Sequence, residues 1–149
     1  MARGQDAARR GGARGKLSGA TLAVLVQHRF EAEAALALAT ELGIEIELVM
    51  LAGIGGPAFL EAIEALLGRP ITADCDDQVG LALESLRLGL RRIVVRPAVG
   101  GETGAMVLSR LQDIARQQGA EVLGEHAGQI HVLAVDGGRF LPLQPHEMP

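Results

Sequence analysis

The sequence predicts an α/β fold built on a mostly parallel sheet, and two observations lead to this prediction. Four helical stretches end on a glycine, at Gly43, Gly68, Gly89 and Gly119, and each runs directly into a short apolar strand. A glycine just past a helix adopts the left-handed conformation that ends the helix at little cost. Helices that alternate with short apolar strands require crossover connections and therefore a parallel sheet.

The elements follow from hydrophobic periodicity along the chain. The expected strands are 21–26, 44–51, 71–73, 92–96 and 121–123, and the expected helices are 30–42, 57–67, 78–88 and one that follows Thr103 as its N-cap. Pro57 pre-sets the first turn of its helix. Two further runs, 130–135 and 139–143, flank Asp136-Gly137-Gly138 and predict a C-terminal antiparallel hairpin.

Two arrangements fit four strand-helix units followed by a hairpin. One is an open three-layer sheet of flavodoxin-like or Rossmann-like type, and the other is a half-barrel that pairs with another copy. We favour the open sheet because a terminal hairpin naturally finishes it. The domain is predicted to span 18–143, between a disordered basic tail at 1–17 and a C-terminal tail at 144–149.

Composition excludes several classes of function. The chain of 149 residues is 48% hydrophobic but has no Trp or Tyr, and this shortage of stacking side chains argues against nucleic acid as a ligand. Lys16 is the only lysine and lies in the tail, which excludes Schiff-base chemistry and the P-loop. Cys75 is the only cysteine and cannot form an internal disulfide, which favours the cytoplasm. No stretch is long enough for a membrane span.

Charge is unevenly distributed along the chain. Residues 1–17 contain five basic side chains and one acidic side chain, whereas the remainder contains nine basic and seventeen acidic ones. An acidic body opposes binding to a polyanion even behind a basic arm.

The loops after the strands are expected to meet at the carboxyl edge of the sheet, where ligands bind in parallel α/β folds. The most specific of them contains Gly53, Gly55 and Gly56, in a G-x-G-x-x-A pattern between a strand and a helix. With Asp74 at the end of the next strand, this is the outline of a dinucleotide site. A smaller phosphate or carboxylate at the same loop is favoured over a dinucleotide, and a plain glycine turn into a proline-initiated helix is the alternative. Further ligand-binding candidates are Arg96, Gly101 and Thr103.

Three residues are candidates for catalysis: His28, Asp74 and Cys75. Asp74 with His28 would supply acid-base chemistry, and Cys75 with His28 would form a nucleophile-base pair only if the first and third strands are neighbours. Asp74 and Asp76 offer hard oxygen ligands for Mg²⁺, although an aspartate in this turn also serves as a helix cap.

The helix 78–88 predicts self-association. Its sheet-facing stripe is complete without Leu81 and Leu88, which lie near one another on the opposite side. Two leucines on an otherwise polar face indicate a partner surface.

These observations lead to one favoured function and two alternatives, and they name no cofactor. The favoured one is a small cytoplasmic domain, oligomeric, that binds an anionic metabolite bearing phosphate or carboxylate at the carboxyl edge of the sheet. The first alternative is an enzyme that uses Asp74 and His28, or Mg²⁺, in the same cleft. The second is a structural or assembly protein without a small-molecule ligand.

Overall fold

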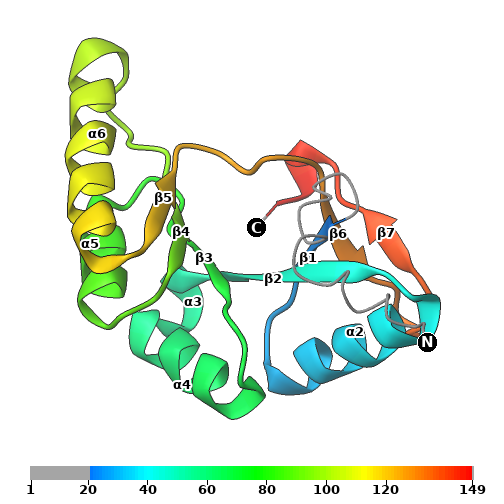
Figure 1. The fold of residues 1–149 in the computed structure, drawn as a ribbon. Helices are drawn as coiled ribbons and strands as arrows, with labels where there is room; N and C mark the ends of the chain where they lie inside the picture. The colour runs from blue at the N-terminus through cyan, green and yellow to red at the C-terminus, as the bar shows by residue number, and fades with distance from the viewer. Residues whose placement is uncertain (1–20, 149) are drawn as a thin grey trace, which may run out of the picture.

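The fold of the protein in a computed structural model, which describes residues 21–148, is shown in Figure 1. The strands are β1 (Thr21–Leu25), β2 (Glu45–Leu51), β3 (Thr72–Asp74), β4 (Arg92–Val94), β5 (Glu121–Leu123), β6 (Ile130–Leu133) and β7 (Phe140–Pro142). The helices are α2 (Arg29–Leu42), α3 (Ala52–Gly55), α4 (Pro57–Leu67), α5 (Val79–Arg87), α6 (Gly101–Gln118) and the short 3-10 helix η2 (Pro145–Glu147). The basic tail predicted for 1–17 lies outside the described residues.

The seven strands form one sheet in the order β5-β4-β3-β2-β1-β6-β7. All neighbouring pairs are parallel except β6 and β7, which are antiparallel and are joined by the predicted turn at Gly137. The predicted fold class is therefore confirmed in its mostly parallel sheet, its connecting helices and its C-terminal antiparallel pair.

The arrangement differs from a flavodoxin-like sheet in strand order, because β2 separates β1 from β3. From β1 to β5 every strand is added on the same side of the preceding one. Crossovers between parallel strands are right-handed, so a sheet that grows in one direction places its helices on one face. Figure 1 shows α2, α4, α5 and α6 on the same side of the curved sheet. Within residues 21–148, loop and C-terminal chain thus lie where a three-layer sandwich would have a second helix layer.

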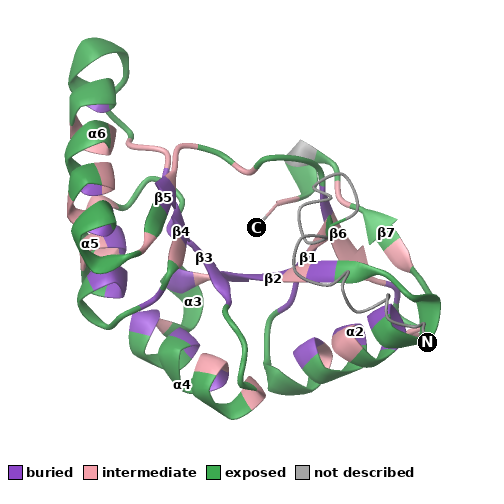
Figure 2. Ribbon diagram, viewed as in Figure 1, coloured by how far each residue is buried: buried purple, intermediate pink, exposed green. Residues whose placement is uncertain are grey.

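The helix-facing side of the sheet forms the main apolar core. Its strand residues alternate along the chain, as Ile46, Leu48 and Met50 do in β2, and all are buried. Figure 2 shows that buried residues concentrate in the central strands and in the helix surfaces turned toward them.

We call the other side the open face, because none of the four connecting helices covers it. It presents Thr72 and Asp74 of β3, since the alternate residues of that strand belong to the main core. Arg92 of β4 lies there with its Nε 2.9 Å from Glu47 Oε2 and its Nη1 2.8 Å from Glu121 Oε1. A smaller apolar cluster on the side of β1, β2 and β6 includes partly buried residues of the C-terminal segment, Leu143 and Met148.

The glycines that were predicted to end four helices do lie at helix ends, but the start of the last helix differs from the prediction. Gly43, Gly68 and Gly119 are C-caps with positive φ, and Gly89 with φ 89° follows the C-cap of α5. The last helix begins at N-cap Gly100 rather than after Thr103. Gly101, the first residue of α6, has φ 63°, a conformation that glycine adopts without steric cost.

Candidate functional site

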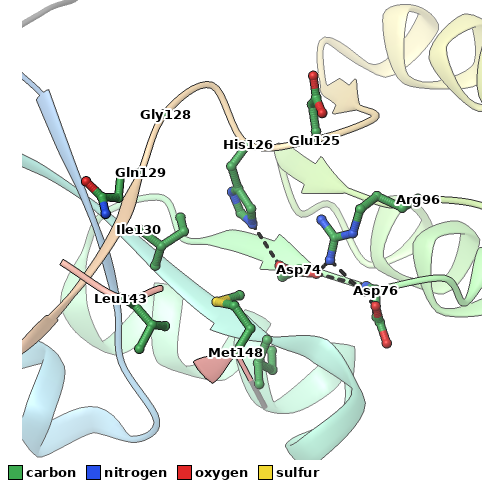
Figure 3. Close-up of a pocket in the computed structure, with 11 residues that line it drawn as sticks. Asp74, Asp76, Arg96, Glu125, His126, Gly128, Gln129, Ile130, Leu143 and Met148 are labelled. Carbon is green, nitrogen blue, oxygen red and sulfur yellow. Dashed lines mark hydrogen bonds and ion pairs between the residues drawn. The ribbon is translucent and has the colours of Figure 1, made fainter. Parts of the chain in front are cut away.

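A pocket of about 680 Å³ lies on the open face near the carboxyl ends of β2, β3 and β4. Figure 3 shows the side chains around it. The charged and polar members are Asp74, Asp76, Arg96, Glu125, His126 and Gln129. The apolar members are Leu51, Ile130, Leu143 and Met148. A concave site with an apolar wall and a few convergent polar groups is typical of small-molecule binding.

Asp74, the last residue of β3, is the most constrained side chain of the site. Its carboxylate is fully buried and accepts three hydrogen bonds. Oδ1 accepts from Arg96 Nη2 at 3.0 Å and from the Asp76 backbone N–H at 2.9 Å, and Oδ2 lies 2.7 Å from His126 Nε2. A buried carboxylate requires partners of this kind, because an unpaired buried charge is very costly.

The pKa of Asp74 lies below its usual value as the result of opposing effects. Burial raises the pKa, but the hydrogen bonds from His126 and from the Asp76 amide, together with the positive charge of Arg96, lower it by more. The carboxylate of Asp74 is therefore ionised at neutral pH.

His126 reaches the site from the connection 124–129 between β5 and β6. Because β5 lies at one edge of the sheet and β6 beside β1, this connection must pass the strands between them. It crosses the open face, and the His126 side chain, 12% exposed, points down to Asp74 (Figure 3). An ionised carboxylate only accepts hydrogen bonds, so Nε2 of His126 carries the hydrogen and Nδ1 is the acceptor when the ring is neutral.

Arg96 follows the end of β4, the neighbour of β3, and this brings its guanidinium to Asp74. Its Nη2 also lies 3.6 Å from Asp76 Oδ1, and its backbone N–H donates to the Asp76 carbonyl at 2.6 Å. Asp76 has φ 54°, and this turn directs its amide toward Asp74. The Arg96 side chain remains 40% exposed, so part of its guanidinium faces the pocket.

The structure brings together three of the residues expected at the site, Asp74, Asp76 and Arg96, and places His28 and Cys75 elsewhere. His28 is the N-cap of α2, where its Nδ1 accepts from the Glu31 N–H at 3.2 Å. Cys75 is buried on the helix-facing side with its Sγ 3.8 Å from Ser85 Oγ. The two are not paired, because β2 lies between their strands.

Burial, together with the nearby charge of Asp74, raises the pKa of the Cys75 thiol to about 11, although the hydrogen bond with Ser85 opposes this shift. A thiol with such a pKa is a poor nucleophile at neutral pH.

The glycine segment forms a helical turn instead of an open loop. Gly53 and Gly55 belong to α3, and the Gly56 amide donates to the Ala52 carbonyl within that turn. A side chain at Gly55 would meet the Phe59 ring at 2.6 Å. None of these glycines lines the large pocket, and Gly55 borders only a crevice of about 20 Å³.

The remaining expected ligand-binding residues, Gly101 and Thr103, are exposed in the first turn of α6 and do not line the large pocket. Over residues 21–148, no group of three or more His, Cys, Asp or Glu side chains is arranged to bind a metal ion. The oxygens of Asp74 instead accept from Arg96, Asp76 and His126.

Sequence reasoning missed His126, the partner of Asp74. His126 lies in a polar connection between Gly124 and Gly128, where hydrophobic periodicity gives no signal. The connection 124–129 itself offered one indication. If the strand after it pairs on the far side of the sheet, the connection must cross one face of the sheet. Met148 was missed because residues 144–149 were interpreted as a C-terminal tail, and Leu143 was predicted only as the end of a strand.

Comparison with known proteins gives no match, either to a protein-family model or to a curated protein sequence. Within the described part of the chain, none of the helices combines the length and the apolar character that a membrane crossing requires.

Proposed function

We propose that this protein binds a small metabolite with an anionic group, a carboxylate or a phosphate, in the pocket that contains Asp74, Arg96 and His126. The observation that most supports this is the Arg96 guanidinium, which is fixed by Asp74 on one side and exposed to the pocket on the other. Arginine binds carboxylates and phosphates through paired donors. The apolar wall would receive the rest of the ligand.

Some N–H groups of the Arg96 guanidinium are available to a ligand. Within residues 21–148, both ion pairs of Arg96 are made by Nη2, so Nε and Nη1 form no hydrogen bond or ion pair with this part of the protein. Asp74 does not repel a bound anion as a free carboxylate would, because Arg96 and the His126 ring both offset its charge.

Thermal-shift measurements with a panel of carboxylates and phosphates test this proposal. A ligand at a hundred times its Kd should stabilise the protein by about 2.7 kcal/mol. We expect Arg96→Gln to weaken binding of the best ligand at least about tenfold. The control is Arg110→Gln, on the exposed side of α6 and outside the pocket, which should leave binding unchanged. Equal affinity of the Arg96→Gln variant would contradict the proposal.

A second candidate function is acid-base catalysis in the same pocket, with His126 in the role that the sequence suggested for His28. The 2.7 Å contact between His126 Nε2 and the ionised Asp74 supports it. In the neutral ring Nδ1 would accept a proton from the ligand, and Asp74 would stabilise the imidazolium that forms.

Exchange of ligand hydrogens with D₂O, followed by NMR, tests for this proton transfer without knowledge of the reaction. We expect His126→Gln to slow exchange by about 10²-fold or more. The control His146→Gln alters an exposed histidine outside the pocket and should have no effect. Identical exchange rates in all three proteins would remove the enzymatic function and leave ligand binding.

We also propose that the protein self-associates and acts in the cytoplasm. The buried, unpaired thiol of Cys75 supports a reducing compartment. Self-association now rests on Leu88, which is 38% exposed, because Leu81 is partly buried and packs against the main core. Leu88→Glu should convert an oligomer into a monomer in light scattering, whereas an unchanged mass would place the contact on another surface.

A further inference from the structure

We infer that the ligand of this pocket is a zwitterion of the α-amino-acid class with a large apolar side chain. The inference rests on the proposed function and specifies its ligand. Figure 3 shows that the charged and apolar groups of the pocket are separated. Arg96 and Asp76 lie on one side of the Asp74–His126 pair, and Ile130, Leu143 and Met148 lie on the other.

The charged end contains both signs of charge. Arg96 lies 3.6 Å from Asp76, whose side chain is 72% exposed, and the exposed Glu125 borders the same pocket. A ligand with only an anionic group would bind Arg96 but would also lie close to the Asp76 carboxylate, which repels it. A ligand with only a cationic group would meet the converse repulsion from Arg96.

A ligand that bears both charges can pair with Arg96 and with Asp76. Its carboxylate would accept hydrogen bonds from the free donors of Arg96, and its ammonium group would donate to Asp76. Since the Arg96 and Asp76 charges are only 3.6 Å apart, the charges of the ligand must be close together as well. An α-amino acid meets this requirement because both groups are attached to one carbon atom.

The apolar end and the volume specify the side chain. Leu51, Ile130, Leu143 and Met148 offer aliphatic and thioether surface, and burial of apolar area favours binding by roughly 25 cal/mol per Å². A pocket of about 680 Å³ has room for a large side chain. A thioether such as that of Met148 packs favourably against an aromatic ring, so phenylalanine is a suitable probe.

Isothermal titration calorimetry with three matched compounds tests the inference. Phenylalanine has both charges, 3-phenylpropanoate lacks the ammonium group, and 2-phenylethylamine lacks the carboxylate. We expect phenylalanine to bind at least about tenfold more tightly than either analogue, because each analogue leaves one charged side of the pocket unpaired.

The outcomes separate this inference from the proposed function. If 3-phenylpropanoate binds as tightly as phenylalanine, the zwitterion inference is wrong and anion binding stands. If 2-phenylethylamine binds as tightly as phenylalanine, the zwitterion inference and the proposed anion binding are both wrong, because the carboxylate and Arg96 then contribute nothing to affinity. If none of the three binds, the zwitterion inference is wrong, and the panel of carboxylates and phosphates decides the proposed function independently.

A pair of neighbouring variants tests the role given to Asp76. Asp76→Asn should reduce the preference for phenylalanine over 3-phenylpropanoate at least about fivefold, because it removes the charge that selects the ammonium group. The variant should fold, since asparagine tolerates the positive φ of 54° at this position. Asp77→Asn, at the adjacent exposed residue outside the pocket, should keep the preference of the unmodified protein. An unchanged preference in Asp76→Asn would overturn the inference.

Discussion

Asp74 shows how one residue links four parts of the chain. Its carboxylate joins the end of β3 to the turn at Asp76, to the end of β4 through Arg96 and to the connection 124–129 through His126. Removal of its charge would leave Arg96 and His126 with a weaker acceptor. The effect on stability depends on pH, because the pKa of Asp74 is lowered in the folded protein.

We expect Asp74→Asn to lower the free energy of unfolding by about 1–3 kcal/mol at neutral pH. The folded pKa lies below the unfolded value, so the stabilisation by ionised Asp74 is complete above about pH 4 and is lost as the pH falls through the folded pKa. The difference between the two proteins should therefore shrink in acid. Urea unfolding over a series of pH values measures it.

Asp113→Asn is the matched control for this experiment. Asp113 pairs with Arg116 on the exposed surface of α6, where ion pairs contribute about 0–1 kcal/mol. Its removal should change stability little at any pH. A loss in Asp74→Asn that is no larger than in the control would contradict the role given to Asp74.

Cys75, the next residue after Asp74, is expected to be chemically inert in the folded protein. Its pKa is raised to about 11 by burial and by the charge of Asp74, against the hydrogen bond with Ser85. Ellman's reagent should thus react with Cys75 only as fast as the protein opens, and rapidly in denaturant. Rapid reaction under native conditions would return Cys75 to the catalytic candidates.

At the scale of elements, glycines determine where helices begin and end, and Gly104 has an additional role. It lies in the first turns of α6, and a Cβ atom there would lie 2.0 Å from the Val99 carbonyl oxygen. The helix can approach the preceding loop this closely only because residue 104 has no side chain.

Gly104→Ala should therefore lower the free energy of unfolding by about 1–3 kcal/mol, because helix and loop must separate. Gly80→Ala in α5 is the matched control, since nothing lies within 4 Å of its Cβ position. That substitution should raise stability by roughly 0.5–1 kcal/mol through helix propensity. Thermal or urea unfolding compares the two, and equal signs would contradict the predicted contact.

At the scale of the whole molecule, the site exists because the sheet grows in one direction from β1 to β5. All four connecting helices then lie on one face, and the open face remains for a pocket. The connection 124–129 and the segment 143–148 bound that pocket, with Leu143 and Met148 packed in the smaller apolar cluster.

Removal of residues 144–149 tests whether the end of the chain belongs to the site. Of the described residues 144–148, none belongs to the main core, so the shortened protein should fold, at a cost of about 1–2 kcal/mol for the lost contacts of Met148. Its affinity for a ligand with an apolar side chain should fall, whereas a Met148→Leu variant of the full chain should retain most of it. Unchanged affinity in the shortened protein would show that the segment is a tail.

Most of the helices and strands, and the fold class, were predictable from the sequence. Apolar runs predicted the strands, and glycines past the helix ends located four helix-to-strand junctions. The meeting of Asp74, Asp76 and Arg96 was also predictable, because residues at the carboxyl ends of neighbouring parallel strands share one edge of the sheet. These are local signals that depend on residues close together in the chain.

The strand order and the histidine partner of Asp74, in contrast, depend on long-range packing. Asp74 and Cys75 lie on opposite sides of the sheet, and which side the helices cover depends on the direction in which strands are added. That direction results from packing among residues far apart in the sequence. It placed β2 between β1 and β3, which separated Cys75 from His28, and it drew the connection 124–129 across the open face, which brought His126 to Asp74.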